Sequence, residues 1–150
     1  MAPTTIPRTD LHTTAAQRLR ADSQRYTTGR RALVTLLDEA TRPLTISELL
    51  GLDPSLAQSS AYRNLAVLER GGVVHRLVTT DEFARFELAE DLTEHHHHLI
   101  CSVCGSMEDF TVSPQLETSL EKAFEKVSTT AGFQTEYHRL DLVGLCPTCH

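Results

Sequence analysis

The sequence predicts an α+β fold in two parts, and three observations lead to it. Apolar residues recur at helical spacing over residues 12–70, with glycine and proline between the segments. Two β-rich runs follow within residues 73–88, around an acidic turn. From residue 95 the chain reads HHHHLICSVC, and a second CxxC pair lies near its end. We therefore expect a helical N-terminal domain with a hairpin, then a small α/β domain stabilised by metal.

The charge of the chain is unevenly distributed. Residues 1–80 hold ten arginines and seven acidic residues, a net charge of +3, whereas residues 81–150 hold four basic and thirteen acidic residues, a net charge of −9. This pattern favours an anionic partner for the first half and cations for the second. The sequence has neither a run of about twenty apolar residues nor a signal peptide, so we expect a cytoplasmic protein with no membrane partner.

Four helices are expected before the hairpin. Residues 12–25 favour a helix that projects the arginines Arg18, Arg20 and Arg25. A second helix carries leucines at helical spacing and stops at Pro43. Thr45 and Glu48 have the spacing of a capping box, which predicts a very short third helix.

The fourth helix is expected to begin at Asp53-Pro54, as N-cap and first-turn proline, and to stop at Gly71-Gly72. The order of helices and hairpin is that of a winged helix-turn-helix, in which one helix enters the DNA major groove. The alternative is a small helical domain with a hairpin that does not bind DNA.

The C-terminal half is expected to add a strand over residues 107–112, a helix over 114–131 and a last strand over 135–145. The helix has an apolar face made of Leu116, Leu120, Ala123, Phe124 and Val127. We expect this face to pack against a small sheet in a dimerisation module.

The two CxxC pairs predict a structural zinc site made of Cys101, Cys104, Cys146 and Cys149. A two-residue gap lets both sulfurs of a pair turn toward one ion at about 2.3 Å. In the cytoplasm, thiolate ligands are favoured over disulfides. Because four sulfurs close the coordination sphere, this metal is expected to hold the fold together.

The four consecutive histidines predict two further sites. Successive residues of an extended segment point to opposite sides, so His95 and His97 face one way and His96 and His98 the other. Each pair needs ligands from elsewhere, and the candidates are His75, Glu87, Glu117, Glu121 and His138. We expect His12 and His150 to be ordinary surface residues. Nitrogen and oxygen ligands suit zinc, ferrous iron and nickel alike.

At this point the sequence resembles a known family. The segments SSAYRNL, GGVVHRL, RFEL, HHHHLICSVCG and GLCPTC follow one another as in ferric uptake regulator (Fur) family repressors, over residues 12–149. The resemblance implies a metal-dependent DNA-binding repressor, not an enzyme, that binds a palindromic operator as a homodimer. It implies a winged helix over 12–89, a hinge over 90–94 and a dimerisation domain over 95–150. Residues 1–11 lie before the resemblance, and because they are rich in proline and threonine we expect a disordered tail there.

The resemblance also assigns site residues. Tyr62 and Arg63 fall on positions that touch base and phosphate, and the whole predicted DNA-binding set is Ser60, Tyr62, Arg63, Asn64, Arg18 and Arg25. A regulatory metal at the hinge is expected on His75, Glu87, His96 and His98. A second regulatory metal is expected on His95, His97 and His138, completed by Glu117 or Glu121, which lie one helical turn apart.

The branch of the family is less closely defined. The histidine in GVVHRL resembles the zinc uptake regulators (Zur), which usually have a cysteine near the position of Ala89 that this chain lacks. Iron- and peroxide-responsive members often take a histidine from the position of Arg42-Pro43-Leu44. We expect zinc-responsive control of metal uptake genes, with Zn²⁺ at the regulatory sites. Sensing of Fe²⁺, Ni²⁺, Mn²⁺ or peroxide is the alternative.

Two classes outside this family remain open as remote alternatives. A zinc hydrolase needs an open metal position and a carboxylate base. Glu94 is the one obvious base beside the histidines, and the helical HExxH spacing is absent from the sequence. A metal-storage protein would bind metal and not DNA.

Overall fold

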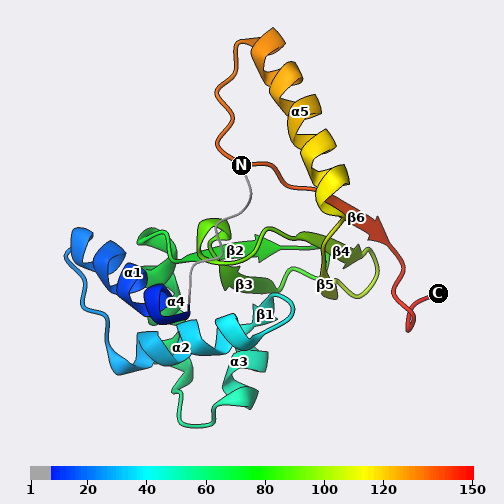
Figure 1. Cartoon of the computed structure of the whole chain (residues 1–150). Helices are drawn as coiled ribbons and strands as arrows, with labels where there is room; N and C mark the ends of the chain where they lie inside the picture. The colour runs from blue at the N-terminus through cyan, green and yellow to red at the C-terminus, as the bar shows by residue number, and fades with distance from the viewer. Residues whose placement is uncertain (1–7) are drawn as a thin grey trace.

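The computed structural model describes residues 8–150 and contains a helical domain, a three-stranded wing sheet and a second three-stranded sheet with a long helix (Figure 1). The elements in order are α1 Arg8–Ala21, α2 Thr28–Glu39, β1 Leu44–Thr45, α3 Ile46–Leu52, α4 Gln58–Arg70, β2 Val74–Val78, β3 Ala84–Leu88, a 3₁₀ turn Glu90–Leu92, β4 His97–Cys101, β5 Met107–Phe110, α5 Pro114–Ala131 and β6 Asp141–Gly144. This architecture confirms the predicted α+β fold. Within the described range, every helix is too short or too polar to cross a bilayer.

Helix α1 begins earlier than the sequence predicted. Residues 8–11 form its first turn and Leu11 is 2% exposed, so the expected disordered tail over 1–11 is wrong for these four residues. Residues 1–7 lie outside the described range. The reason is that Leu11, Ala15 and Leu19 form one buried stripe with a spacing of four residues, and helix formation from Arg8 buries all three.

His12 is a second correction, because it is half-buried and not a surface residue. Its Nδ1 lies 2.6 Å from the hydroxyl of Tyr26, and its Nε2 lies 3.4 Å from the hydroxyl of Thr35 on α2. Burial lowers the pKa of His12 and raises that of Tyr26 to about 12. This polar contact joins α1 to α2.

Helices α3 and α4 form the helix-turn-helix. The predicted capping box is present, with the Thr45 hydroxyl accepting from Glu48 N and the Glu48 carboxylate accepting from Thr45 N. The predicted start of the fourth helix at Asp53 is wrong. The Asp53 carboxylate accepts hydrogen bonds from the backbone N and the hydroxyl of Ser55, which holds a turn, and α4 begins at Gln58.

The wing is an antiparallel sheet of order β1-β3-β2. Strands β2 and β3 are the predicted hairpin, and the short β1, which was not predicted, pairs Leu44 with Phe86 of β3. The main apolar core lies between this sheet and the four helices. It ends with Leu92 in the 3₁₀ turn, so the predicted hinge is anchored to the N-terminal domain at that residue.

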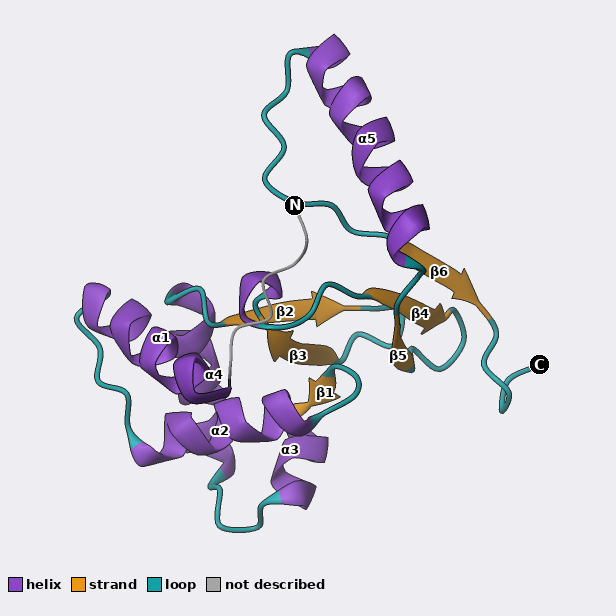
Figure 2. Ribbon diagram, viewed as in Figure 1, coloured by secondary structure: helices purple, strands orange, loops and turns teal. Residues whose placement is uncertain are grey.

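The second sheet has the order β5-β4-β6, and β4 runs antiparallel to β5 and parallel to β6. Helix α5 projects away from the sheet and none of its residues is buried, so the expected packing of its apolar face on the sheet is wrong for a single chain (Figure 2). Leu116 is 48% exposed and Val127 is 67% exposed. An exposed apolar face of this kind is typical of a protein–protein contact.

Few apolar side chains are buried in the C-terminal domain. Beyond Leu92, the buried side chains of the described residues are His97, His98, Cys101 and Met107. Three of these four side chains carry metal-ligating atoms. The domain therefore lacks the apolar burial that a fold of this size normally needs.

The tip of the wing lies against the Cys101–Cys104 turn. Thr80 donates from its hydroxyl to the carbonyl of Ser102, at 3.2 Å. The Asp81 carboxylate, held by Arg85 at 2.7 Å, lies beside Gly105. The hydrogen bond from Arg85 lowers the pKa of Asp81 well below its usual range. The turn between the wing strands is therefore also a contact between the two domains.

Gly105→Ala is expected to destabilise the protein more than Gly72→Ala. Both glycines have a left-handed φ, +73° and +72°, which costs an alanine about 1 kcal/mol. A Cβ on Gly105 would overlap the carboxyl group of Asp81, whereas a Cβ on Gly72 meets nothing within 4 Å. We expect a loss on the order of 3 kcal/mol for Gly105→Ala. Equal losses in thermal unfolding of the two variants would contradict the close packing of Gly105 on Asp81.

Candidate metal centres

The four cysteines come together at the end of β4 and after β6. They are all free thiols, and their four Sγ atoms lie within 4.8 Å of one another. The Sγ atoms of Cys104 and Cys146 are 3.7 Å apart. Four sulfurs at about 2.3 Å from a zinc ion would be separated by about 3.8 Å, so the residues fit a tetrahedral zinc site.

The surroundings of this cluster favour the thiolate at Cys101 and Cys146, whereas the hydrogen bond with Cys146 raises the pKa of Cys149 to about 12. Backbone N–H groups of Cys104 and Cys146 lower the pKa of the Cys101 thiol to about 6. The backbone N–H of Thr148 lowers the pKa of Cys146. Since the thiolate is the form that binds metal, the backbone prepares Cys101 and Cys146 for a cation.

A second cluster lies between the two domains. Strand β3 of the wing contributes Glu87, whose Oε2 accepts hydrogen bonds from His96 Nε2 at 3.0 Å and His98 Nε2 at 2.9 Å. Asp109 of β5 brings its Oδ1 to within 3.9 and 3.7 Å of the same two nitrogens. We call Glu87, His96, His98 and Asp109 the hinge cluster.

The pKa values of the groups in the hinge cluster are shifted from their ordinary values. Burial opposes ionisation of Glu87, but hydrogen bonds from His96 and His98 outweigh it and lower the pKa of the carboxyl to about 2. The bond to Glu87 raises the pKa of His96 to about 9. Burial raises the pKa of Asp109, and its Oδ1 is buried without a hydrogen bond. A buried oxygen without a donor, beside two imidazoles, fits a cation at this point.

The structure does not bring His75 into the hinge cluster. His75 pairs with Glu87 across the β2–β3 ladder, but the Glu87 carboxylate turns to the β4 histidines and the His75 ring lies 6.2 Å from the ring of Tyr137. Asp109 takes the fourth position, and sequence reasoning missed it. Its signal was available, because a hairpin across the Cys101–Cys104 turn sets Asp109 directly opposite His98.

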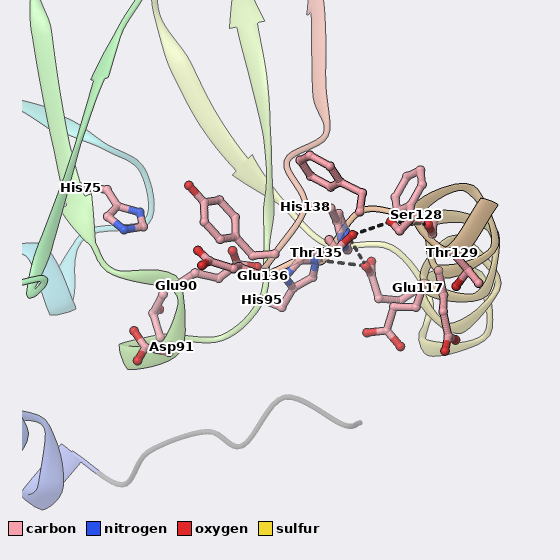
Figure 3. Close-up of a pocket in the computed structure, with 16 residues that line it drawn as sticks. His75, Glu90, Asp91, His95, Glu117, Ser128, Thr129, Thr135, Glu136 and His138 are labelled. Carbon is pink, nitrogen blue, oxygen red and sulfur yellow. Dashed lines mark hydrogen bonds and ion pairs between the residues drawn. The ribbon is translucent and has the colours of Figure 1, made fainter. Parts of the chain in front are cut away.

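The third cluster, on the opposite side of β4, we call the second regulatory cluster. It contains His95 from the segment before β4, His97 from the start of β4, Glu117 from α5 and His138 from the loop before β6. Figure 3 shows His95 and His138 directed toward Glu117, with His75 apart on β2. The alternation predicted for the four histidines is thus present in the geometry, with His95 and His97 on one side and His96 and His98 on the other.

In the second regulatory cluster, ring nitrogens of three histidines converge on the carboxylate of Glu117. Glu117 Oε1 lies 2.9 Å from His95 Nε2 and 3.1 Å from His138 Nε2, and all three atoms are buried without a geometrically satisfactory hydrogen bond. Glu117 Oε2 accepts a hydrogen bond from His97 Nε2 at 2.9 Å. Ligand atoms that crowd together without bonding to one another fit a metal ion between them.

Glu121, the other predicted candidate, is not among these four residues. It lines the cleft beside the cluster, one helical turn beyond Glu117. One turn of α5 carries a side chain about 6 Å along the helix axis. Helix α5 runs away from the sheet from its N-terminal end onward (Figure 1). Glu121 is therefore farther from the histidines than Glu117 and lies outside the second regulatory cluster.

The residues predicted to bind DNA differ in exposure. Tyr62 is 56% exposed on α4, and Arg63 beside it and Arg25 in the α1–α2 loop are also exposed. The other three, Ser60, Asn64 and Arg18, are half-buried.

Two of these half-buried residues are engaged within the protein. Asn64 accepts a hydrogen bond from Arg30 Nε at 3.1 Å. Arg18 pairs with Asp91 and donates to the carbonyl of Gly72 at 2.6 Å. Sequence reasoning could not separate these roles, because the partners are distant in the chain.

Fold and clusters together define a class of protein. A winged helix-turn-helix shares a group of potential metal-ligating side chains with a second, ligand-rich domain, and Tyr62 and Arg63 of α4 are exposed. This arrangement is that of a DNA-binding protein whose domain boundary carries residues that could hold a metal ion.

Comparison with known proteins gives the family. The sequence profile of the Ferric uptake regulator family matches residues 21–143. The peroxide-responsive repressor PerR of Staphylococcus saprophyticus is 33% identical over 135 residues, which are 87% of this chain and 86% of that protein. The chain belongs to the ferric uptake regulator family, whose members are metal-responsive regulators that bind DNA as dimers and are not enzymes.

Solved structures agree. A zinc-bound manganese uptake regulator is 28% identical, covers 91% of this chain and 98% of its own, and superposes with a TM-score of 0.61. The Helicobacter pylori ferric uptake regulator Fur is 24% identical, covers 96% of this chain and 97% of its own, and has a TM-score of 0.66. At that identity the second likeness establishes the fold.

Proposed function

We propose that the protein is a zinc-responsive transcriptional repressor that controls metal uptake genes in the cytoplasm. The observation that carries the proposal is the hinge cluster. Glu87 belongs to the wing of the DNA-binding domain, whereas His96, His98 and Asp109 belong to the second domain. A metal ion held by all four would fix the two domains in the arrangement that binds DNA. Its effect on DNA binding is set by the ratio of its affinities for this arrangement and for the arrangements that do not bind DNA.

The ligand number favours zinc. Each regulatory cluster offers four ligand groups among the described residues, and protein zinc sites are mostly four-coordinate. Manganese and ferrous iron more often take additional oxygen ligands. In the same way, we propose zinc at the four cysteines, where it would be structural.

Peroxide-responsive or iron-responsive regulation is the second candidate, and the likeness to PerR of Staphylococcus saprophyticus favours it. If His96, His98 and carboxylates held ferrous iron, hydrogen peroxide would be the oxidant and would be reduced at the iron, and a nearby histidine could be oxidised in that reaction. Against it, the segment before α3 supplies no ligand. Arg42 occupies that segment and pairs with Glu48 at 3.0 Å.

The surfaces for DNA and for a second chain are distinct. We propose that α4 enters the major groove with Tyr62 and Arg63, and that a second copy of the chain covers the apolar face of α5. Leu116 and Val127 are on this helix, and Leu142 and Val143 are more than half exposed on β6. Two winged helices in a symmetric dimer would read a palindromic operator.

A gel shift on DNA upstream of zinc- and iron-uptake operons tests the function. We expect retardation with buffered Zn²⁺ and none with chelator. A shift with Fe²⁺ that peroxide abolishes would replace zinc by the second candidate, and a shift with Ni²⁺ or Mn²⁺ alone would assign that metal. Retardation that no metal changes would overturn the metal-responsive function, and metal binding without retardation under any condition would indicate metal storage.

Arg63→Ala is expected to weaken DNA binding and to reduce its dependence on salt. If the guanidinium contacts one phosphate, the slope of log K against log salt should fall by about one. Arg70→Ala, at the other end of α4, is the control with the same change of charge. Equal slopes for the Arg63→Ala variant and the unmodified protein would remove Arg63 from the phosphate contacts.

Asp109→Asn is expected to weaken metal binding at the hinge cluster, whereas His75→Ala is expected to leave it unchanged. The carboxylate of Asp109 faces the cluster, and the ring of His75 faces Tyr137. Titration of the metal-free regulatory sites against a chromophoric chelator measures both affinities. A loss for His75→Ala with none for Asp109→Asn would restore the ligand set that the sequence predicted.

A further inference from the structure

The 3₁₀ turn Glu90–Leu92 joins the two domains and is held firmly by the first. Leu92 is 3% exposed in the N-terminal core. Asp91 pairs with Arg18 of α1, and Arg18 also donates to the carbonyl of Gly72, the second residue after α4. The position of this turn is therefore set by the DNA-binding domain.

The same turn also reaches the second regulatory cluster. The Oε1 atom of Glu90 contacts Nδ1 of His95, while the other ring nitrogen of His95, Nε2, lies 2.9 Å from Glu117 Oε1. Figure 3 shows His95 between Glu90 on one side and Glu117 on the other. Glu90 and His95 are both largely shielded from solvent, with side-chain exposures of 28% and 17%.

A histidine that binds metal through one ring nitrogen needs an acceptor for the N–H on the other. A carboxylate in that place fixes the tautomer and the ring orientation, and makes the histidine a better ligand. In the hinge cluster, His96 Nδ1 lies 2.8 Å from the carbonyl of Glu94, in the same linker. Residues 90–94 thus supply the outer partner of one histidine in each regulatory cluster.

We propose that Glu90 is a positioning residue for His95 and connects the second regulatory cluster to the DNA-binding domain. The proposal rests on the metal-binding role assigned above to that cluster. Filling the cluster orients His95, His95 holds Glu90, and Glu90 holds the turn that Asp91 and Leu92 anchor to the winged helix. The second cluster then belongs to the hinge as well as to the C-terminal domain, and its metal supports the same domain arrangement.

Cobalt titration of the full chain tests the positioning role. The structural zinc is kept and His96→Ala disables the hinge cluster, so Co²⁺ reports the second cluster through its visible absorption, in competition with a chelator. Adding Glu90→Ala is expected to weaken Co²⁺ binding about 10- to 100-fold. Glu90→Gln, which keeps an oxygen acceptor without the charge, is expected to lose less.

The matched control is Glu125→Gln. Glu125 is exposed on α5 and lines the same cleft, which has a volume of about 890 Å³. Its substitution removes one negative charge, as the Glu90 substitutions do, at a side chain that does not contact His95. We expect no change in Co²⁺ affinity. An equal loss in Glu125→Gln would assign the effect to net charge, and an unchanged affinity in Glu90→Ala would also overturn the positioning role.

Hydrogen exchange provides a readout that a purely structural role would not move. At saturating Co²⁺, amide exchange over residues 89–94 is expected to slow in the protein that retains Glu90. In the Glu90→Ala variant, Co²⁺ is expected to leave the exchange of these residues unchanged. Slowing of equal size in both would overturn the connection through Glu90. If Co²⁺ does not bind this cluster at all while Glu90 is intact, both this inference and the metal-binding role of the cluster are wrong.

Discussion

Cys146→Ser is expected to release the structural metal and unfold the C-terminal domain. Beyond Leu92 the buried side chains are His97, His98, Cys101 and Met107, so little apolar burial supports this domain without its metal. Binding of structural zinc contributes about 10 kcal/mol or more to folding in small zinc domains. We expect the loss of one zinc ion per chain and a destabilisation of several kcal/mol. Zinc analysis of the purified protein and thermal unfolding measure the two effects.

The control for this variant is Thr148→Ala. The side chain of Thr148 is exposed in the same CPTC turn. The backbone N–H of Thr148 lowers the pKa of Cys146, and alanine keeps this N–H. We expect full zinc content and unchanged unfolding. If Cys146→Ser also retains its zinc and its thermal stability, the four-cysteine site is not the structural element of the domain.

His96→Ala is expected to abolish metal-dependent DNA binding while the protein stays folded. His96 contacts Glu87 of the wing, so its loss removes a ligand from the cluster that spans both domains. The side chain is 13% exposed and belongs to no apolar core, which is why the fold should survive. Gel shifts across a series of buffered zinc concentrations measure the effect, and circular dichroism checks the fold.

The comparison for this prediction is His138→Ala, which removes a ligand from the second regulatory cluster. We expect it to move the midpoint of the metal dependence to higher zinc without abolishing the response. Its effect passes through Glu117, His95 and Glu90, whereas His96 acts on the wing directly. Identical losses in His96→Ala and His138→Ala would show that the two clusters do not act separately.

Local chemistry explains which elements were predictable. The capping box at Thr45 and Glu48, the hairpin of the wing and the long helix after Pro114 each depend on residues within a few positions of one another. The start of α4 was misplaced for a local reason as well. Asp53 can cap a helix or hold an Asx turn, and pattern reasoning cannot rank the two without the packing of α3 against α4.

The ligand groups show the same division between local and distant information. The alternation of the four histidines, two before β4 and two in it, follows from extended-chain geometry, and the CxxC spacing follows from the size of a tetrahedral metal site. Both patterns depend on residues within a few positions of one another in the sequence. The partners that complete each cluster come from other elements, and the choices of Asp109 over His75 and of Glu117 over Glu121 depend on the β4–β5 register and on the direction of α5.

The sequence by itself determined the two-domain α+β order, the four cysteines as one group and the division of the histidines into two pairs. It did so because each of these depends on spacing along the chain. The tertiary structure alone decided that α5 leaves its sheet, that Arg18 pairs with Asp91 and that Glu90 reaches His95. These contacts join residues whose separation in space depends on how the domains pack, and that packing depends on the sum of many weak contacts.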